Sequence, residues 1–286
     1  MLTTRRQMLG ALIGSATASG VRLNAHTPSA VKPEGAYLVT SGGDRIDEHF
    51  RPLLDTHARK LVFIPTAASS LRSKYGTIWN PDLEENRDAF VRELLLRFNA
   101  LEVQILHTRS RHVADSEEFV RPLRTAGAVW MSGGNAGRLA DAYLDTRVVA
   151  ELRDIVNRGG IVAGESAGAI IQGSYVVRGN PDKPVLMVNG RDRGFGLLPN
   201  VAINPHLTAS QRENELVSVI DRFPDLLGLG IDDDAGLLIR GGVGEVIGSG
   251  RVAVYDNQKH SGAWYFWLKP GDRIDLRARL TPAAAR

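Results

Sequence analysis

The chain has 286 residues, and its hydrophobic share of 43% suits one sizeable globular domain. It carries 35 basic and 32 acidic residues, but three arginines and no acid lie in residues 1–25, so the rest of the chain has 32 of each and a net charge of zero. This balance argues against a nucleic-acid-binding protein, and the lack of cysteine excludes disulfides, cysteine nucleophiles and cysteine-bound metals.

The first residues predict an export signal. Arg5 and Arg6 precede a short, mildly apolar run without acidic residues, which is typical of a twin-arginine signal. We therefore expect residues 1–25 to engage the twin-arginine export machinery and the mature protein to be periplasmic or extracellular. We expect no membrane association once the signal is removed. An ordinary amphipathic N-terminal helix is the alternative.

Apolar runs in the first half of the chain predict strands, and each ends in small or polar residues. These runs lie at 37–40, 61–64, 103–106, 128–131 and 160–163. Helix-like stretches, at 87–98 and 136–153, lie between them. Strands that alternate with helices predict an α/β fold with a mostly parallel sheet covered by helices on both faces.

The last third of the chain has a different pattern. Two strand-like runs end at Pro205 and Ile231, and the first is followed by a helix-like stretch that begins near Ser210. Beyond them, turn signals separate short runs at 237–240, 245–248, 252–255 and 264–268. This pattern predicts an antiparallel C-terminal extension within a single domain over residues 35–282.

The segment Gly-Glu-Ser-Ala-Gly-Ala at residues 164–169 is the most informative one. It follows a predicted strand and precedes a helix, which is the arrangement of a nucleophile elbow, G-x-S-x-G, with Ser166 at its apex. The small flanking residues let the backbone turn sharply, and the amide of Ala167 then faces whatever the serine attacks. The alternative interpretation is a capping serine in a glycine-rich turn.

Other small, polar loops also follow predicted strands, at 41–43, 65–70 and 132–135. In parallel α/β sheets, ligands gather at the carboxyl ends of the strands. We therefore expect these loops and the serine elbow to form one shared site.

A serine nucleophile needs a general base. Of the seven histidines, His206 follows an apolar strand-like run and is therefore placed like Ser166. His260 lies in a predicted hairpin turn, where exposure to solvent is the usual condition. His206 is the stronger candidate, and His260 remains a second one.

The base in turn needs an acid that orients it. Asp233 belongs to three consecutive aspartates, 232–234, that follow the strand-like run ending at Ile231, and Asp182 is a rival. No histidine or glutamate stands close enough in sequence to these aspartates to complete a metal shell. We therefore expect neither a metal nor a cofactor.

Several motifs occur in an order that is far more specific than any one of them. They are Phe-Ile-Pro-Thr-Ala-Ala-Ser at 63–69, Ser-Gly-Gly-Asn at 132–135, the elbow at 164–169, Gly-Phe-Gly-Leu-Leu at 194–198, His206, and Gly-Leu-Gly-Ile-Asp-Asp at 228–233. This set resembles the cyanophycinases and the related aspartyl dipeptidases over about residues 35–280. The resemblance implies a serine peptidase with a class I glutamine-amidotransferase-like (flavodoxin-like) fold.

The resemblance also implies roles for individual residues. Ser166 matches the nucleophile of the family and His206 its general base. Asp233 matches the acid, which is usually glutamate in cyanophycinases. The amides of Gly134 and Ala167 match the oxyanion hole.

The substrate-binding positions depart from the family pattern. Cyanophycinases usually carry glutamine where this chain has Ala136 and Asp-Gln where it has Asn204 and Pro205. Of the several arginines that follow their histidine, only Arg212 remains here. We expect the substrate to be contacted by Asn135, Glu165, Asn204 and Arg212.

These observations predict an exported serine peptidase that cleaves Asp-containing or isopeptide-linked peptides through an acyl-enzyme. The partner is a peptide or polypeptide substrate, and a homodimer is compatible with the sequence. One alternative is an α/β-hydrolase-type esterase that uses Ser166, Asp233 and His260. Another is a non-catalytic binding protein on the same fold.

Overall fold

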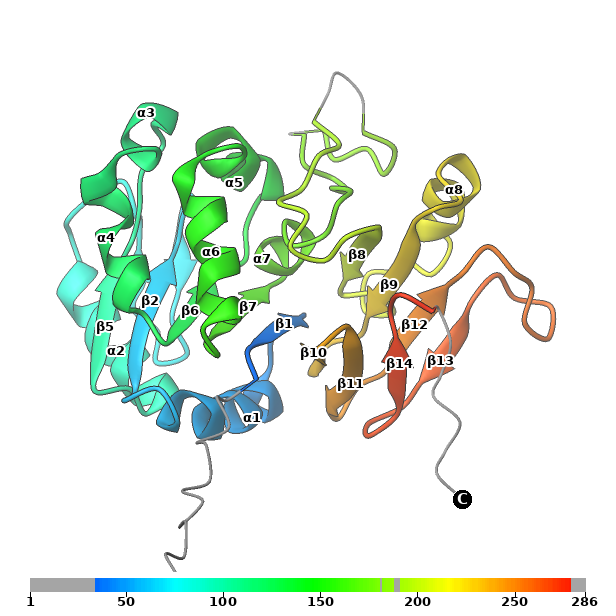
Figure 1. Cartoon of the computed structure of the whole chain (residues 1–286), viewed down its shortest axis with the longest axis horizontal. Coiled ribbons are helices and arrows are strands. Elements are labelled where there is room, and N and C mark those ends of the chain that lie inside the picture. The colour runs from blue at the N-terminus through cyan, green and yellow to red at the C-terminus, as the bar shows by residue number, and fades with distance from the viewer. Residues whose placement is uncertain (1–33, 181, 188–190, 279–286) are drawn as a thin grey trace, which may run out of the picture. The chain divides into compact units, whose positions relative to one another are not determined.

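The strands predicted in the first half of the chain lie side by side in the central sheet of the computed structural model, which describes residues 34–180, 182–187 and 191–278 (Figure 1). The predicted export signal lies outside the described residues. In order across the sheet, the strands are β14 (Arg273–Asp275), β11 (Val243–Gly248), β10 (Ala235–Arg240), β1 (Ala36–Thr40), β7 (Ile161–Glu165), β6 (Ala128–Met131), β2 (Lys60–Ile64) and β5 (Glu102–Ile105).

Strand directions confirm the predicted fold class. The neighbours β1, β7, β6, β2 and β5 are parallel. On the other side of β1, the strands β10, β11 and β14 are antiparallel. The sheet is therefore mostly parallel in its larger part and carries an antiparallel C-terminal extension.

Helices cover both faces of the parallel part. One face carries α1 (Asp44–Asp55) and α2 (Arg87–Phe98), and the other carries α3 (Arg111–Ala114), α4 (Glu117–Thr125), α5 (Ala136–Tyr143) and α6 (Arg147–Asn157). Within β2, Leu61 and Phe63 pack under α1 and α2, whereas Val62 and Ile64 pack under the second group. Successive side chains of a strand point to opposite faces, so a continuous apolar run suits a sheet buried on both sides. None of the helices in the described ranges is both long and apolar enough to cross a membrane.

The helix predicted over 136–153 is two helices. The backbone leaves the helical conformation at Leu144, and Asp145 has a φ of 58°. The hydroxyl of Thr146 donates a 2.7 Å hydrogen bond to the carbonyl of Tyr143, and α6 then begins at Arg147. The break lets α5 and α6 pack different apolar faces onto one core, which the continuous helix-like pattern did not indicate.

A second sheet contains strands from the last third of the chain, where the sequence pattern predicted only an antiparallel extension. Its order is β13 (Phe266–Leu268), β12 (Val252–Tyr255), β9 (Leu227–Ile231) and β8 (Val201–Pro205). Its inner face, with Ile203 and Leu229, packs on Leu237 and Ile239 of the antiparallel extension. Helix α8 (Glu215–Arg222) covers its outer face. The extension is thus covered partly by this sheet, and β8 and β9 carry His206 and Asp233 to the central sheet.

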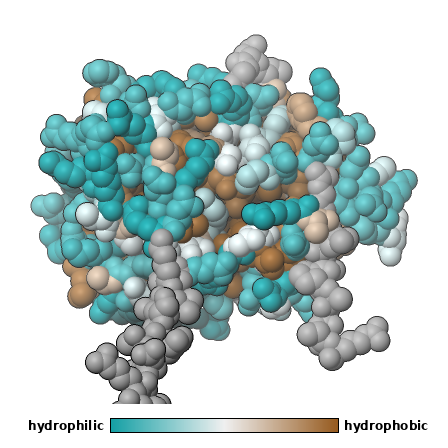
Figure 2. Space-filling model, viewed as in Figure 1, coloured by the Kyte–Doolittle hydropathy of each residue, from teal (hydrophilic) through white to brown (hydrophobic). Residues whose placement is uncertain are grey.

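Apolar side chains reach the surface where the two sheets meet. Figure 2 shows a mainly hydrophilic surface over the helices and apolar residues near the middle of this face. A hollow between the sheets is lined in part by Tyr37, Leu198, Ile239 and Leu276. Tyr37 stands near the amino end of β1, so this hollow lies at the edge opposite to the one where the parallel strands end.

Candidate active site

Ser166 stands at a sharp turn between β7 and the short helix α7 (Ala167–Ile170). Its φ of 54° and ψ of −109° are unusual for a residue with a side chain, and such strain is a feature of functional sites. A Cβ at Gly164 would lie 2.0 Å from the carbonyl oxygen of Gly168, and a Cβ at Gly168 would lie 2.3 Å from that of Met131. Only glycine fits at either position, which explains the G-x-S-x-G spacing.

The structure brings Ser166, His206 and Asp233 together. The Nε2 atom of His206 lies 3.1 Å from the Oγ atom of Ser166, and its Nδ1 atom lies 2.5 Å from Oδ1 of Asp233. These three residues come from β7 and from the loops that follow β8 and β9. Such contacts on both ring nitrogens are what a serine nucleophile, a base and an orienting acid require.

Ser41 holds His206 in place. The amide of His206 donates a 3.1 Å hydrogen bond to Oγ of Ser41, and this hydroxyl donates a 2.9 Å bond to the carbonyl of Ile231. Ser41 is buried and follows β1, so one hydroxyl joins the ends of β1, β8 and β9. The sequence indicates a small-residue loop at 41–43 but gives no sign of this role for Ser41.

The neighbours of Asp233 have separate tasks. Asp232 accepts hydrogen bonds from the amide and hydroxyl of Thr208, at 3.2 and 2.8 Å, and so shapes the loop after His206. Asp234 accepts a 3.1 Å bond from the amide of Arg45 and thereby caps α1. Among the described residues, histidines and acids form no group of three or more that could hold a metal ion.

The loop at 132–135 lies against the nucleophile. A Cβ at Gly133 would be 3.3 Å from the Cβ of Ser166. Gly134 has a φ of 139°, and a Cβ there would overlap the carbonyl of Ala67 at 2.3 Å. Ala167 is the first residue of α7, so its amide has no acceptor within the helix. The amide of Ala167 therefore adjoins Ser166, and the Gly133–Gly134 segment that carries the other predicted oxyanion donor lies against it.

A network of polar contacts supports the loop at 132–135. The carbonyl of Ala67 accepts the amide of Asn135 at 2.9 Å, and Arg109 donates to the carbonyl of Ala68 at 2.7 Å. Arg109 also pairs with Asp82, which bonds to His107 at 3.0 Å. Hydrogen bonds from Arg109 and His107 lower the pKa of Asp82 to about 2. Asp82 is therefore a carboxylate at neutral pH and anchors the network as an acceptor.

The predicted substrate-binding residues differ in what their side chains touch. Asn204 is fully buried, and its amide is bonded to Arg178 and, at 3.0 Å, to Glu215. In this arrangement Asn204 does not reach the surface, so its predicted contact with substrate gains no support from the structure. Arg178 was missed by sequence analysis, and its isolated position in a long loop gave no signal.

The remaining three predicted contacts keep some exposure. The Asn135 side chain caps α5 by accepting the amide of Gly137 at 2.8 Å. Arg212 is half-buried and donates to the carbonyl of Pro205 at 3.3 Å. Glu165 is half-buried beside Ser166, and its carboxylate accepts a 3.2 Å bond from Arg97.

The alternative triad is not assembled. Nε2 of His260 bonds to Asp256 at 2.8 Å, and its ring packs edge-on against Phe266. The loop between β12 and β13, which carries His260, projects away from β7 (Figure 1). The structure therefore does not bring His260 to Ser166, as the esterase alternative would require. Asp182 is exposed in the loop before β8, and the acid beside His206 is Asp233.

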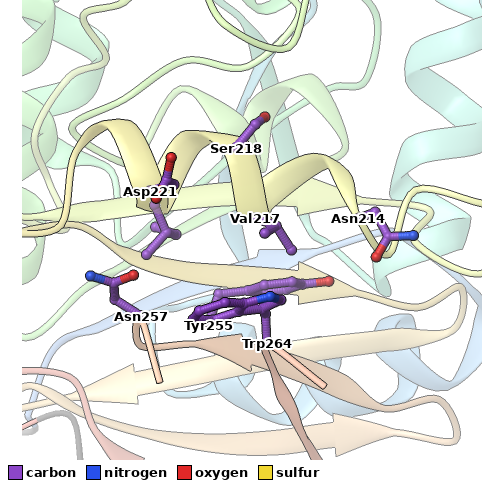
Figure 3. A pocket seen from close by; sticks show the side chains of 8 residues that line it. Asn214, Val217, Ser218, Asp221, Tyr255, Asn257 and Trp264 are labelled. Atoms are coloured by element: carbon purple, nitrogen blue, oxygen red, sulfur yellow. The ribbon is translucent and has the colours of Figure 1, made fainter. Parts of the chain in front are cut away.

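Another hollow lies between α8 and the second sheet. Figure 3 shows the rings of Tyr255 and Trp264 on one side of it and Val217, Ser218 and Asp221 of α8 on the other. None of the residues that line it belongs to the Ser166 constellation. It is therefore separate from the candidate active site.

The fold and the serine elbow define the class of protein as a serine peptidase with a class I glutamine-amidotransferase-like fold. The sequence model of peptidase family S51 matches residues 37–247. The chain belongs to this family.

Relatives agree with this assignment. A cyanophycinase from Nostoc sp. is 32% identical over 208 residues, which are 65% of this chain and 70% of the relative. A peptidase E from Nostoc sp. is 23% identical over 237 residues, covering 80% of this chain and 87% of the relative. A solved structure of a peptidase from an acI-B1 actinobacterium has the same fold, with a TM-score of 0.63, 22% identity, and coverage of 85% of this chain and 98% of that one.

Proposed function

We propose that the protein hydrolyses Asp-containing or isopeptide-linked peptides through a triad of Ser166, His206 and Asp233. The observation that carries this proposal is the pair of hydrogen bonds on the imidazole, 3.1 Å to Ser166 and 2.5 Å to Asp233. The strained backbone of Ser166, the adjoining amide of Ala167 and the Gly133–Gly134 loop against it add support, because an acyl-transfer site needs an accessible nucleophile and donors for the oxyanion.

Acylation uses each group once. Nε2 of His206 takes the hydroxyl proton while Oγ of Ser166 attacks the amide carbonyl carbon. Asp233 accepts the Nδ1–H of the imidazole and stabilises the imidazolium. The amides of Gly134 and Ala167 donate to the oxyanion. The carbon–nitrogen bond then breaks, and His206 gives its proton to the leaving amine.

Deacylation repeats these steps with water. His206 takes a proton from a water molecule, whose oxygen attacks the ester carbon of the acyl-enzyme. The ester bond breaks, the proton returns to Oγ of Ser166, and the acid product leaves. The net reaction consumes one water molecule for each bond that is cleaved. Every proton transfer in it runs through His206.

A fluorophosphonate probe tests the proposal directly. Such a probe reacts with an activated serine, and peptide mapping locates the modified residue. We expect a single label on Ser166 in the protein without its export signal. Labelling confined to another serine, or none at a concentration that labels a known serine peptidase, would reject the triad.

Substrate preference is the next expectation. Relatives of this chain are named cyanophycinase and peptidase E, but here Ala136 replaces the usual glutamine and Glu215 stands at an arginine position. Each charged hydrogen bond lost costs roughly 1–3 kcal/mol. We therefore expect small Asp-containing peptides to be cleaved with a much higher kcat/KM than cyanophycin. Rapid release of β-Asp-Arg from cyanophycin by the purified protein would contradict this expectation.

We also propose that the twin arginines direct export. Replacing both Arg5 and Arg6 by lysine is expected to leave the protein in the cytoplasm of its host, because the recognition element is lost while the positive charge stays. Cell fractionation and N-terminal sequencing measure the result. Arg22→Lys, outside the pair, is the matched control. Undiminished export of the double variant would remove the twin-arginine assignment.

A further inference from the structure

One peptide unit in the loop after β2 supports the segment that carries the Gly134 amide. A Cβ at Gly134 would lie 2.3 Å from the carbonyl oxygen of Ala67 and 2.8 Å from the amide nitrogen of Ala68. The backbone of Gly134 is therefore in close contact with the peptide that joins these two alanines. The carbonyl of Ala67 also accepts the amide of Asn135 at 2.9 Å. A tilt of this peptide would therefore displace the Gly134 amide.

Arg109, in the segment after β5, holds this peptide from both ends. One Nη atom donates to the carbonyl of Thr66, and the other donates to the carbonyl of Ala68 at 2.7 Å. The two carbonyls on either side of Ala67 are thus joined to one rigid, planar group. Arg138 adds a longer contact of 3.3 Å to the carbonyl of Ala67 itself. The guanidinium of Arg109 therefore sets the orientation of the loop over three consecutive residues.

The carboxylate of Asp82 anchors Arg109. It follows the hairpin of β3 (Leu71–Arg72) and β4 (Ile78–Trp79) and accepts two 3.1 Å hydrogen bonds, from Nε and from one Nη of Arg109. Together with the two carbonyls, these bonds use four of the five N–H groups of the guanidinium. Arg109 therefore keeps little capacity to bind a substrate carboxylate, and its contacts serve the loop.

A second chain of hydrogen bonds joins the same carboxylate to Thr66. Nε2 of His107 lies 3.0 Å from Asp82, and its Nδ1 lies 2.9 Å from Oγ1 of Thr66, which lies 2.6 Å from the hydroxyl of Tyr143. Burial raises the pKa of Tyr143 to about 12, so the phenol keeps its proton. Burial also lowers the pKa of His107, although the bond to Asp82 opposes this change, so the ring is neutral at pH 7.

These protonation states give the chain one direction. An ionised Asp82 can only accept, so Nε2 of His107 carries the ring proton and Nδ1 accepts. Tyr143 therefore donates to Thr66, Thr66 donates to His107, and His107 donates to Asp82. Thr66 is fully buried, so its side chain fixes one end of the loop while Arg109 fixes the carbonyls. Both sets of bonds depend on Asp82.

We propose that Arg109 is a positioning residue for the reaction, which aligns the Gly134 amide with the oxyanion through the Ala67–Ala68 peptide. The proposal rests on the function proposed above. Arg109 acts through the loop and makes no contact with the reacting atoms. An oxyanion forms only in the transition state, so the loss of this alignment weakens transition-state binding and leaves substrate binding unchanged.

The first test removes the guanidinium. For an Asp-containing peptide, kcat of Arg109→Ala should fall about 10- to 100-fold, because a misplaced donor loses much of its effect. The affinity for a peptide boronic acid, which forms a tetrahedral adduct with Ser166, should fall by the same factor. Binding of the uncleaved peptide, measured in Ser166→Ala with and without Arg109→Ala, should stay within about twofold. A merely structural disturbance would weaken that binding as well.

The second test restores the lost group. Arg109 keeps 35% of its side chain exposed, so guanidinium ion from solvent can reach the vacated position in Arg109→Ala. At a low, non-denaturing concentration, guanidinium chloride should recover part of the lost kcat, and sodium chloride at the same concentration should not. Arg109→Lys should still lose about 10-fold in kcat, because a single ammonium cannot span both carbonyls and Asp82.

Arg121→Ala is the matched control, because Arg121 is exposed on α4 and lies outside this network. It should keep full activity. If Arg109→Ala does not fold, Arg109→Lys takes its place in the kcat, boronic acid and binding measurements. Full kcat in the Arg109 variant, an unchanged affinity for the boronic acid, or a parallel loss of peptide binding would overturn the proposal.

Probe labelling separates failure of this proposal from failure of the triad. If Ser166 is labelled at the same rate in Arg109→Lys and in the unaltered protein, and both cleave the peptide equally, the role of Arg109 is wrong and the triad stands. If Ser166 of the unaltered protein is not labelled and no peptide is cleaved, the triad is wrong, and the role of Arg109 falls with it.

Discussion

Replacing Ser166 by alanine is expected to reduce peptide hydrolysis by about four to six orders of magnitude, the usual consequence of losing a triad nucleophile. The fold should survive, because the Oγ atom of Ser166 bonds to His206 and the structural constraints of the turn lie in Gly164 and Gly168. Thermal unfolding should therefore change by only a few degrees. Initial rates on an Asp-containing peptide and a melting curve measure the two quantities.

Ser218→Ala is the matched control for this variant. Ser218 is exposed on α8, and its hydroxyl donates only to the carbonyl of Glu215 within its own helix, at 2.9 Å. It should retain full activity. Undiminished hydrolysis by correctly folded Ser166→Ala would show that another residue attacks the substrate.

The part of the site that depends on local backbone geometry could be predicted from the sequence. A Cβ at Gly164 or Gly168 would overlap a carbonyl oxygen, so only glycine fits there. The tight turn is therefore determined by residues that lie close together in the sequence. The alternation of apolar runs and helices also fixes the fold class, because strands buried on both faces need continuous apolar runs. Helix α2 begins and ends where the helix-like stretch at 87–98 predicted.

The parts that depend on distant contacts could not be predicted. Ser41 supports His206 across 165 positions of the chain, and Arg97 reaches Glu165 across 68. Nothing in the neighbouring residues of Ser41 or Arg97 marks these contacts. For the same reason the sequence does not indicate that the side chain of Asn204, a predicted substrate contact, is buried against Arg178 and Glu215.

The sequence also does not indicate which of the two sheets a strand belongs to. The runs that form β8 and β9 are buried on every residue, as the central strands are, so their pattern fits either sheet. The strands β8 and β9 join the second sheet because this sheet packs on the apolar face of the antiparallel extension. This second sheet is central to the proposed chemistry, because it brings His206 and Asp233 to a serine held by the first sheet.

His206→Ala is expected to lower kcat/KM about as much as Ser166→Ala, since an isolated serine hydroxyl is a weak nucleophile at neutral pH. The kcat/KM of His260→Ala should remain close to that of the unaltered protein, because His260 bonds to Asp256 in the loop between β12 and β13. Near-full activity of His206→Ala together with inactivity of His260→Ala would reject the assignment of the base.

Asp233→Asn is expected to lose activity by about four orders of magnitude while the site keeps its shape, because an amide there favours the wrong tautomer of His206. Asp233 is only 2.5 Å from Nδ1, yet 55% of its side chain is exposed. Exposure lets water replace part of the lost interaction, so the loss should not exceed that of His206→Ala. Asp182→Asn, a change in an exposed loop residue, is the matched control and should be near full activity. Equal losses in the two aspartate variants would mean that the short bond to His206 contributes nothing specific to the reaction.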